Sequence, residues 1–162
     1  MKYFTLRWWR KTQDLNCPPQ IINGPRDAYE TYYRSIRSRL PKAVRLLEKK
    51  IFLSDATLIN LFIDLHKRSL VLTVITLGGN ARSHVLEIHY KGVSRFKTSA
   101  GPGKGLLGPN GYGDIGYYEI EIIDDDLFEQ RVLFSSGIEF SFRFENVELF
   151  QKRKNKKKIK LA

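Results

Sequence analysis

The chain is poor in cysteine and in long apolar runs, and both absences exclude classes of protein. Cys17 is the single cysteine among 162 residues, so no intrachain disulfide can form. No stretch reaches the length of about 18 consecutive apolar residues that a membrane-spanning helix needs. The N-terminal residues carry positive charge but lack the apolar centre and the small-residue cleavage site of a signal peptide. We therefore expect a cytoplasmic protein of a bacterium.

Histidine is scarce as well, and catalytic patterns are missing. The histidines are His66, His84 and His89, and the last two fall on opposite faces of one predicted strand, so they make no zinc-binding pair. None of them lies in the context of a base that activates a nucleophile. The three acids at 124–126 lie in a predicted tight turn and cannot all bind one cation. We predict no catalytic residue, no metal site and no cofactor, which favours a non-enzymatic protein.

A glycine-rich segment, residues 98–113, holds six of the twelve glycines. It contains a Gly-x-Gly-x-x-Gly spacing, but proline follows where a dinucleotide-binding helix would have to begin. A Walker loop would need Ser or Thr directly after Lys104, and Gly105 stands there. Two alternatives stay open: a simple connection between strands, or a loose anion site formed by Gly103, Lys104 and Gly105.

The net charge of +11 is concentrated at the C-terminal end. Seven cations and no acid lie in the last eleven residues, which leaves +4 for the other 151. We predict that residues 151–162 form a disordered Lys-rich tail behind a single domain, residues 1–150. Such a tail either keeps the protein soluble or binds RNA, DNA or an anionic membrane surface without reading sequence. Its cations are Lys152, Arg153, Lys154, Lys156, Lys157, Lys158 and Lys160.

Helical periodicity is confined to the N-terminal third. Thr5 is a good N-cap for a short first helix. Pro25 stands where helices favour proline, in the first turn, and apolar residues recur every three or four positions over 28–40. A second short helix is predicted to end at Lys49 and Lys50.

From residue 57 onwards the apolar period changes from helical to two, which indicates strands. Alternation from Ile59 to Leu65 and again from Leu70 to Val74 predicts a hairpin with Leu65 opposite Leu70. The other face of this hairpin is too apolar to meet only water, so either the N-terminal helices cover it or it forms a homo-oligomer. That face includes Leu58, Phe62 and Ile75.

Residues 117–144 show three alternating runs separated by two turn clusters, which is typical of an antiparallel meander. Placing Ile123 opposite Leu127 brings Glu119 against Arg131, an opposite-charge cross-strand pair. A register shifted by one residue would set apolar residues against polar ones, so it is rejected.

The second turn of the meander fixes the next pairing. Placing Phe134 opposite Ile138 gives a three-residue loop with Gly137 at its left-handed position. This register sets Glu129 against Arg143. The predicted fold is α+β, with N-terminal helices packed on an antiparallel sheet of about six strands.

Several short sequences are similar to a bacterial family of small uncharacterised proteins. They are the opening Met-Lys-Tyr-Phe-Thr, Trp8-Trp9, a Tyr-rich helix, Leu53-Ser54-Asp55-Ala56 and the closing Leu-Phe-Ser-Ser-Gly-Ile-Glu-Phe-Ser-Phe. Proteins with similar closing meanders are sometimes grouped with immunity proteins of toxin systems. The resemblance implies binding to a protein partner and transfers no catalytic residue.

The sequence thus supports two hypotheses from different classes. The first is a non-enzymatic binding protein, immunity-like, that recognises a protein partner through a sheet face or through residues 98–113. The alternative is a nucleic-acid-associated protein that uses the basic C-terminal tail.

Overall fold

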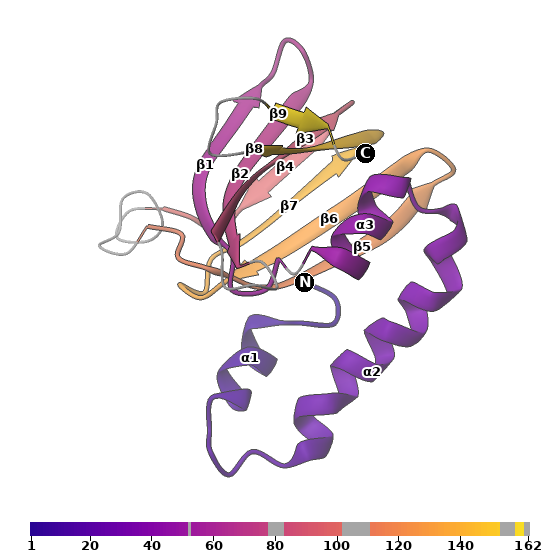
Figure 1. Ribbon diagram of the computed structural model, residues 1–162. Helices are drawn as coiled ribbons and strands as arrows, with labels where there is room; N and C mark the ends of the chain where they lie inside the picture. Colours follow the sequence, from indigo (N-terminus) through magenta and orange to yellow (C-terminus); the bar gives the residue numbers. More distant parts are fainter. Residues whose placement is uncertain (52, 78–82, 102–110, 153–157, 161–162) are drawn as a thin grey trace.

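The computed structural model describes residues 1–51, 53–77, 83–101, 111–152 and 158–160, which form an α+β protein (Figure 1). The helices are α1 (Leu6–Thr12), α2 (Pro19–Ile36), the 3₁₀ turn η1 (Arg37–Arg39) and α3 (Lys42–Lys50). The strands are β1 (Thr57–Asp64), β2 (Ser69–Leu77), β3 (Ser83–Lys91), β4 (Arg95–Thr98), β5 (Ile115–Asp124), β6 (Leu127–Phe134), β7 (Glu139–Phe144), β8 (Asn146–Lys152) and β9 (Lys158–Lys160). None of these helices has the length and apolar character to cross a membrane.

The strands form two antiparallel sheets, so the prediction of one sheet of about six strands is wrong. Their orders are β1-β2-β3-β8-β9 and β4-β7-β6-β5. The chain leaves the first sheet after β3, builds the second, and returns as β8. Both passages lie at one corner, where Gly92 has a φ of 68° and a Cβ would collide with the Glu145 side chain. The positive φ at this corner favours glycine. The sequence did not predict two sheets, because an alternating pattern does not indicate which sheet a strand joins.

The apolar faces of the two sheets share one core. Tyr90 of β3 packs edge-to-face against Phe142 and Phe144 of β7, with ring centroids 4.6 and 4.9 Å apart. Its buried hydroxyl donates a hydrogen bond to Gln130 Oε1 at 2.8 Å. Helix α3 packs against β8 and adds Leu47 to this core.

The predicted pairing of the meander is confirmed. Glu119 lies opposite Arg131, and Glu129 lies opposite Arg143. Gly137 has a φ of 76°, in the left-handed region that glycine favours. The first turn differs in detail, because an irregularity between Ile122 and Asp124 shortens the loop and pairs Asp124 with Leu127.

Helix α2 begins at Pro19, six residues earlier than predicted, and Pro25 lies inside it. A proline within a helix cannot donate to the carbonyl four positions before it, here that of Ile21. The indole Nε1 of Trp8 donates to this carbonyl at 2.7 Å instead. The tryptophan of α1 therefore compensates for the proline of α2 and holds the two helices together.

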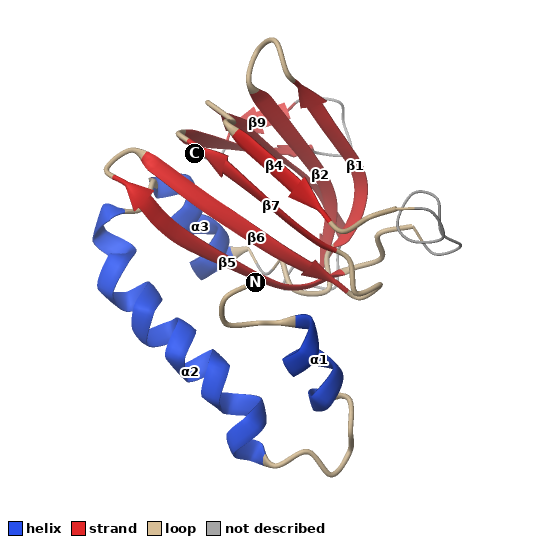
Figure 2. Cartoon of the chain, turned by 180° about the vertical axis from the view of Figure 1, so that it is seen from behind, coloured by secondary structure: helices blue, strands red, loops and turns tan. Residues whose placement is uncertain are grey.

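The C-terminal half of α2 also protects the free edge of β5, beside which it lies in Figure 2. The backbone N–H of Ile120 donates to the Tyr29 hydroxyl at 3.0 Å, and that of Ile122 donates to the Tyr32 hydroxyl at 3.3 Å. An edge strand with unpaired N–H groups invites pairing with other chains. Two tyrosines of a helix thus take the place of a neighbouring strand.

The first hairpin differs from its prediction by two residues. Asp64 pairs with Ser69, and Leu65 lies in the turn, where 86% of it is exposed. The Asp64 carboxylate accepts a hydrogen bond from Lys67 N at 2.9 Å, which favours the turn at this position. A bulge at Ile59 also moves Leu58 opposite Val74, onto the core face. Leu58 therefore does not share the outer face with Phe62 and Ile75.

The C-terminal segment is more ordered than predicted where the structure describes it. Gln151 and Lys152 complete β8, and Lys158–Lys160 form β9, which pairs with β8. Strand formation here depends on backbone hydrogen bonds at a sheet edge. A charge-rich sequence does not indicate such bonds. The rest of the predicted tail, residues 153–157 and 161–162, lies outside the described residues.

Candidate functional site

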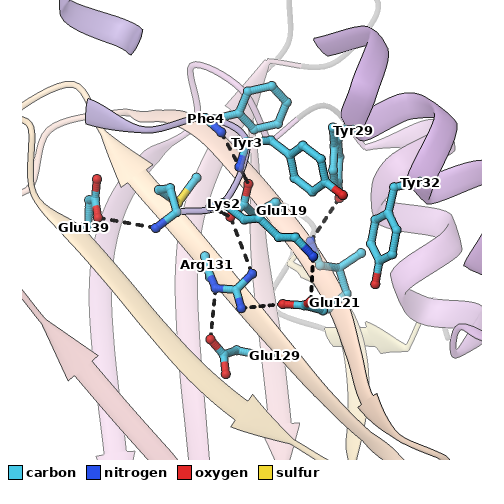
Figure 3. Close-up of polar contacts among 12 residues, drawn as sticks. Lys2, Tyr3, Phe4, Tyr29, Tyr32, Glu119, Glu121, Glu129, Arg131 and Glu139 are labelled. Atoms are coloured by element: carbon cyan, nitrogen blue, oxygen red, sulfur yellow. Dashed lines mark hydrogen bonds and ion pairs between the residues drawn. The ribbon is translucent and has the colours of Figure 1, made fainter. Parts of the chain in front are cut away.

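The most densely charged cluster of the described residues lies on the outer face of the second sheet (Figure 3). Its centre is Glu119, which is 1% exposed. The Glu119 carboxylate accepts hydrogen bonds from three successive backbone N–H groups, those of Lys2, Tyr3 and Phe4, the last two at 2.9 and 3.4 Å. We call residues 2–4 and their contacts with Glu119 the N-terminal anchor.

Arg131 connects the anchor to the neighbouring acids. Its guanidinium lies 3.6 Å from Glu119, 2.5 Å from Glu121 and 2.9 Å from Glu129. Burial acts to raise the pKa of Glu121, but hydrogen bonds and charges from Arg131 and Lys2 outweigh it and hold that pKa below its ordinary value. The pKa of Glu129 is lowered in the same way, with Arg143 as its strongest partner.

This arrangement favours a structural role for the acids of the cluster. A general acid or base needs a pKa near the working pH and room beside it for a substrate. Glu121 and Glu129 have lowered pKa values, and Glu119 is enclosed by backbone amides. The sequence identified Arg131 as a partner of Glu119 but gave no signal that residues 2–4 would reach it.

A second carboxyl group, that of Glu48 on α3, has a pKa that is raised and not lowered. It lines a hollow of about 340 Å³ together with Glu30, Tyr33 and Arg37. Burial raises the pKa of Glu48 from 4.5 to about 7, while a hydrogen bond from the Tyr29 hydroxyl, at 3.4 Å, acts to lower it. The charge of Glu48 therefore changes near neutral pH.

We expect Glu48 to make the protein less stable as the pH rises. Between pH 4.5 and about 7 the folded protein holds a proton that the unfolded chain has lost. The free energy of unfolding should therefore fall by about 1–3 kcal/mol across this window. Urea denaturation of the wild type and of Glu48→Gln on both sides of the window will measure it, and the variant should lose this pH dependence.

The matched control is Glu30→Gln, which changes an exposed carboxyl lining the same hollow. It should keep the wild-type slope of stability against pH. Equal slopes in the wild type and in Glu48→Gln would contradict the role given to Glu48.

A third feature is a groove between α1 and α2, with a volume of about 330 Å³. Trp8, Ile21 and Pro25 supply its apolar lining, and Ile21 is 39% exposed. Arg7 and Lys11 stand one turn apart on α1 and line the same groove. Both cations are exposed, and within the described residues neither lies in an ion pair.

The groove lies in the positively charged N-terminal third of the chain. Residues 1–50 hold twelve Lys and Arg against four Asp and Glu, a net charge of +8. Residues 51–150 hold nine against thirteen, a net charge of −4. The mildly basic body therefore consists of a cationic helical part and an anionic strand part. This division is visible in the sequence when charges are counted separately in residues 1–50 and in residues 51–150.

The other predicted sites are placed as follows. Gly103, Lys104 and Gly105 lie outside the described residues, as do Arg153, Lys154, Lys156 and Lys157. Lys152 ends β8, and Lys158 and Lys160 belong to β9. Among the described residues no three His, Cys, Asp or Glu side chains gather as metal ligands would.

Comparisons with known proteins give little further information. No protein-family model and no curated protein matches the chain. The chain is similar to the crystal structure of an uncharacterized protein from Neisseria gonorrhoeae, with 13% sequence identity and a TM-score of 0.43. The match covers 59% of this chain and 90% of that one.

Proposed function

We propose that the protein is a non-enzymatic binding protein that recognises an acidic segment of a protein partner through the groove between α1 and α2. The observation that carries this proposal is the pairing of an apolar lining with Arg7 and Lys11 in one groove. An apolar side chain of the partner would occupy the lining, and neighbouring carboxylates would meet the two cations.

The distribution of charge supports the same surface. The helical part carries +8 and the strand part −4, so an acidic partner is attracted to the helices and repelled by the sheets. Figure 1 shows α1 and the first half of α2 extending beyond the sheets, where a partner can reach them. An immunity-like protein that binds a protein partner is one form of this function.

A structural role for the acids around Arg131 also favours binding over catalysis. Glu119, Glu121 and Glu129 are engaged by Arg131 and, for Glu119, by backbone amides. A nucleic-acid-binding role is the second candidate. Strand β9 favours it, because β9 places Lys158–Lys160 next to β8. The basic helix α3 packs against the same strand, β8.

Affinity purification from the source cells with matched baits tests both candidates. The wild type should retain a stoichiometric protein partner, and Arg7→Glu/Lys11→Glu should lose it because the charge of the groove is reversed. Arg95→Glu/Lys97→Glu, which reverses two exposed cations on β4, should retain it. A chain that ends at Lys152 should behave as the wild type.

Two outcomes contradict the proposal. One is the absence of a stoichiometric protein partner, and the other is a partner that Arg7→Glu/Lys11→Glu holds as well as the wild type does. Recovery of nucleic acid that is lost with residues 153–162 would favour the second candidate instead. Its binding should then weaken with salt, with a slope of at most about −5 on single strands if all seven tail cations take part.

A further inference from the structure

The four sheet edges of the described chain are not protected equally. Strand β5 is covered by Tyr29 and Tyr32 of α2. The edge strand β4 has four residues and carries Arg95 and Lys97, and β9 has three residues, two of them lysines. Short length and basic side chains are the devices by which proteins prevent edge strands from pairing.

Strand β1 lacks the short length, the basic side chains and the helical cover, and its one protective feature is the bulge at Ile59, which leaves residues 60–64 regularly paired with β2. It is an eight-residue edge strand, and Asp64 is its one charged residue. Asp114 bridges its first residue, Thr57, and within the described residues no strand lies beside the remainder, 58–64. A long edge strand with apolar side chains and little charge pairs readily with another strand.

Exposed apolar side chains gather at the same edge. Six large apolar residues are exposed among the described residues, and three of them lie on β1 or its turn. Ile59 is 51% exposed, Phe62 is 55% exposed and Leu65 is 86% exposed. The bulge that places Leu58 in the core leaves Ile59 at the surface.

We infer that β1 pairs with β1 of a second copy, so that two five-stranded sheets join into one continuous sheet across a twofold axis. Symmetry brings Ile59 and Phe62 of one copy against the same residues of its partner. The strand has no cation with which to recognise an acidic partner strand, so it favours an occupant that is largely apolar and carries little charge. Its own sequence meets that requirement.

The charges near the edge permit this pairing. Asp64 forms an ion pair with Lys67 at 3.8 Å within its own chain, so two copies of β1 bring no unpaired like charges together. The repulsion that remains comes from the net charge of +11 on each whole chain. Because salt screens that repulsion, added salt should strengthen the dimer, whereas a dimer held by ion pairs would weaken.

Sedimentation velocity of the full chain over a wide range of concentration tests the inference. We expect a monomer–dimer equilibrium that shifts towards dimer with concentration and with added NaCl. Phe62→Lys should weaken the dimer at least about tenfold, because the substitution places two cations at the symmetric contact. Leu15→Lys, at a fully exposed site between α1 and α2, should leave the equilibrium unchanged.

Circular dichroism and thermal melting will show that each variant is folded, and Ile59→Lys provides a second edge substitution should Phe62→Lys not fold. A chain that stays monomeric at every concentration overturns the inference. So does a dimer that survives both edge substitutions, because it would have to use another surface. The dimer edge and the α1–α2 groove share no residue, so either proposal can fail without the other.

Discussion

Replacing Phe142 by alanine should lower the free energy of unfolding by about 3–5 kcal/mol. The side chain is fully buried in β7, between Phe140 and Phe144 with ring centroids 5.8 and 5.9 Å away. It also meets Tyr90 of the other sheet edge-to-face at 4.6 Å. The substitution therefore removes contacts within one sheet and between the two, and leaves a cavity that the surrounding strands cannot fill by collapsing. Urea denaturation measures the loss.

Leu15→Ala is the control for Phe142→Ala. Leu15 is a large apolar residue that is fully exposed, so its truncation should change stability by no more than about 0.5 kcal/mol. Both variants should be compared at a low protein concentration, at which the proposed dimer dissociates. If Phe142→Ala costs no more than Leu15→Ala, the assignment of β7 to the shared core is wrong.

Glu119→Ala should also lower the free energy of unfolding by about 3–5 kcal/mol, the cost typical of breaking a buried charge pair. The substitution leaves Arg131 without one of its acids and the backbone N–H groups of Tyr3 and Phe4 without their acceptor. Hydrogen exchange of these amides gives a second measurement, because they should lose protection before the rest of the protein unfolds.

Glu145→Ala is the matched control for this prediction. Glu145 is an exposed carboxylate that pairs with Arg68 at 2.9 Å, and removing such a surface pair should cost about 0–1 kcal/mol. Unchanged protection of the Tyr3 and Phe4 amides in Glu119→Ala would contradict the N-terminal anchor. It would show that aromatic packing of Phe4 against Tyr117, with ring centroids 5.0 Å apart, holds residues 2–4 in place.

The sequence predicted those parts of the fold that depend on local rules. The pairings Glu119–Arg131 and Glu129–Arg143 followed from a period of two and from short turns, since a slip of one residue would reverse the faces. Thr5 caps α1 as expected and accepts from Trp8 N at 3.1 Å. In each case the residues that fix the structure are close in sequence or lie on adjacent strands.

The remaining features depend on contacts between distant residues. The sequence predicts a helix start at Pro25, because the hydrogen bond from Trp8 to Ile21, which makes an internal proline tolerable, cannot be seen in the sequence. The chain passes between the two sheets at a corner where Gly92 lies against Glu145, 53 positions further along the chain. The candidate groove requires α1 to lie against α2. The surplus of cations in residues 1–50 is visible in the sequence, but the sequence does not show that two of them, Arg7 and Lys11, line one groove.

The N-terminal anchor has a consequence for synthesis on the ribosome. Lys2, Tyr3 and Phe4 precede their acceptor, Glu119, by 115 to 117 positions. At roughly 5–20 residues per second, on the order of 10 s pass between the translation of these residues and that of Glu119. During this time Phe4 and Trp8, both buried in the finished protein, have no strand β5 to pack against. Residues 2–4 can therefore reach their final position only after β5 has emerged.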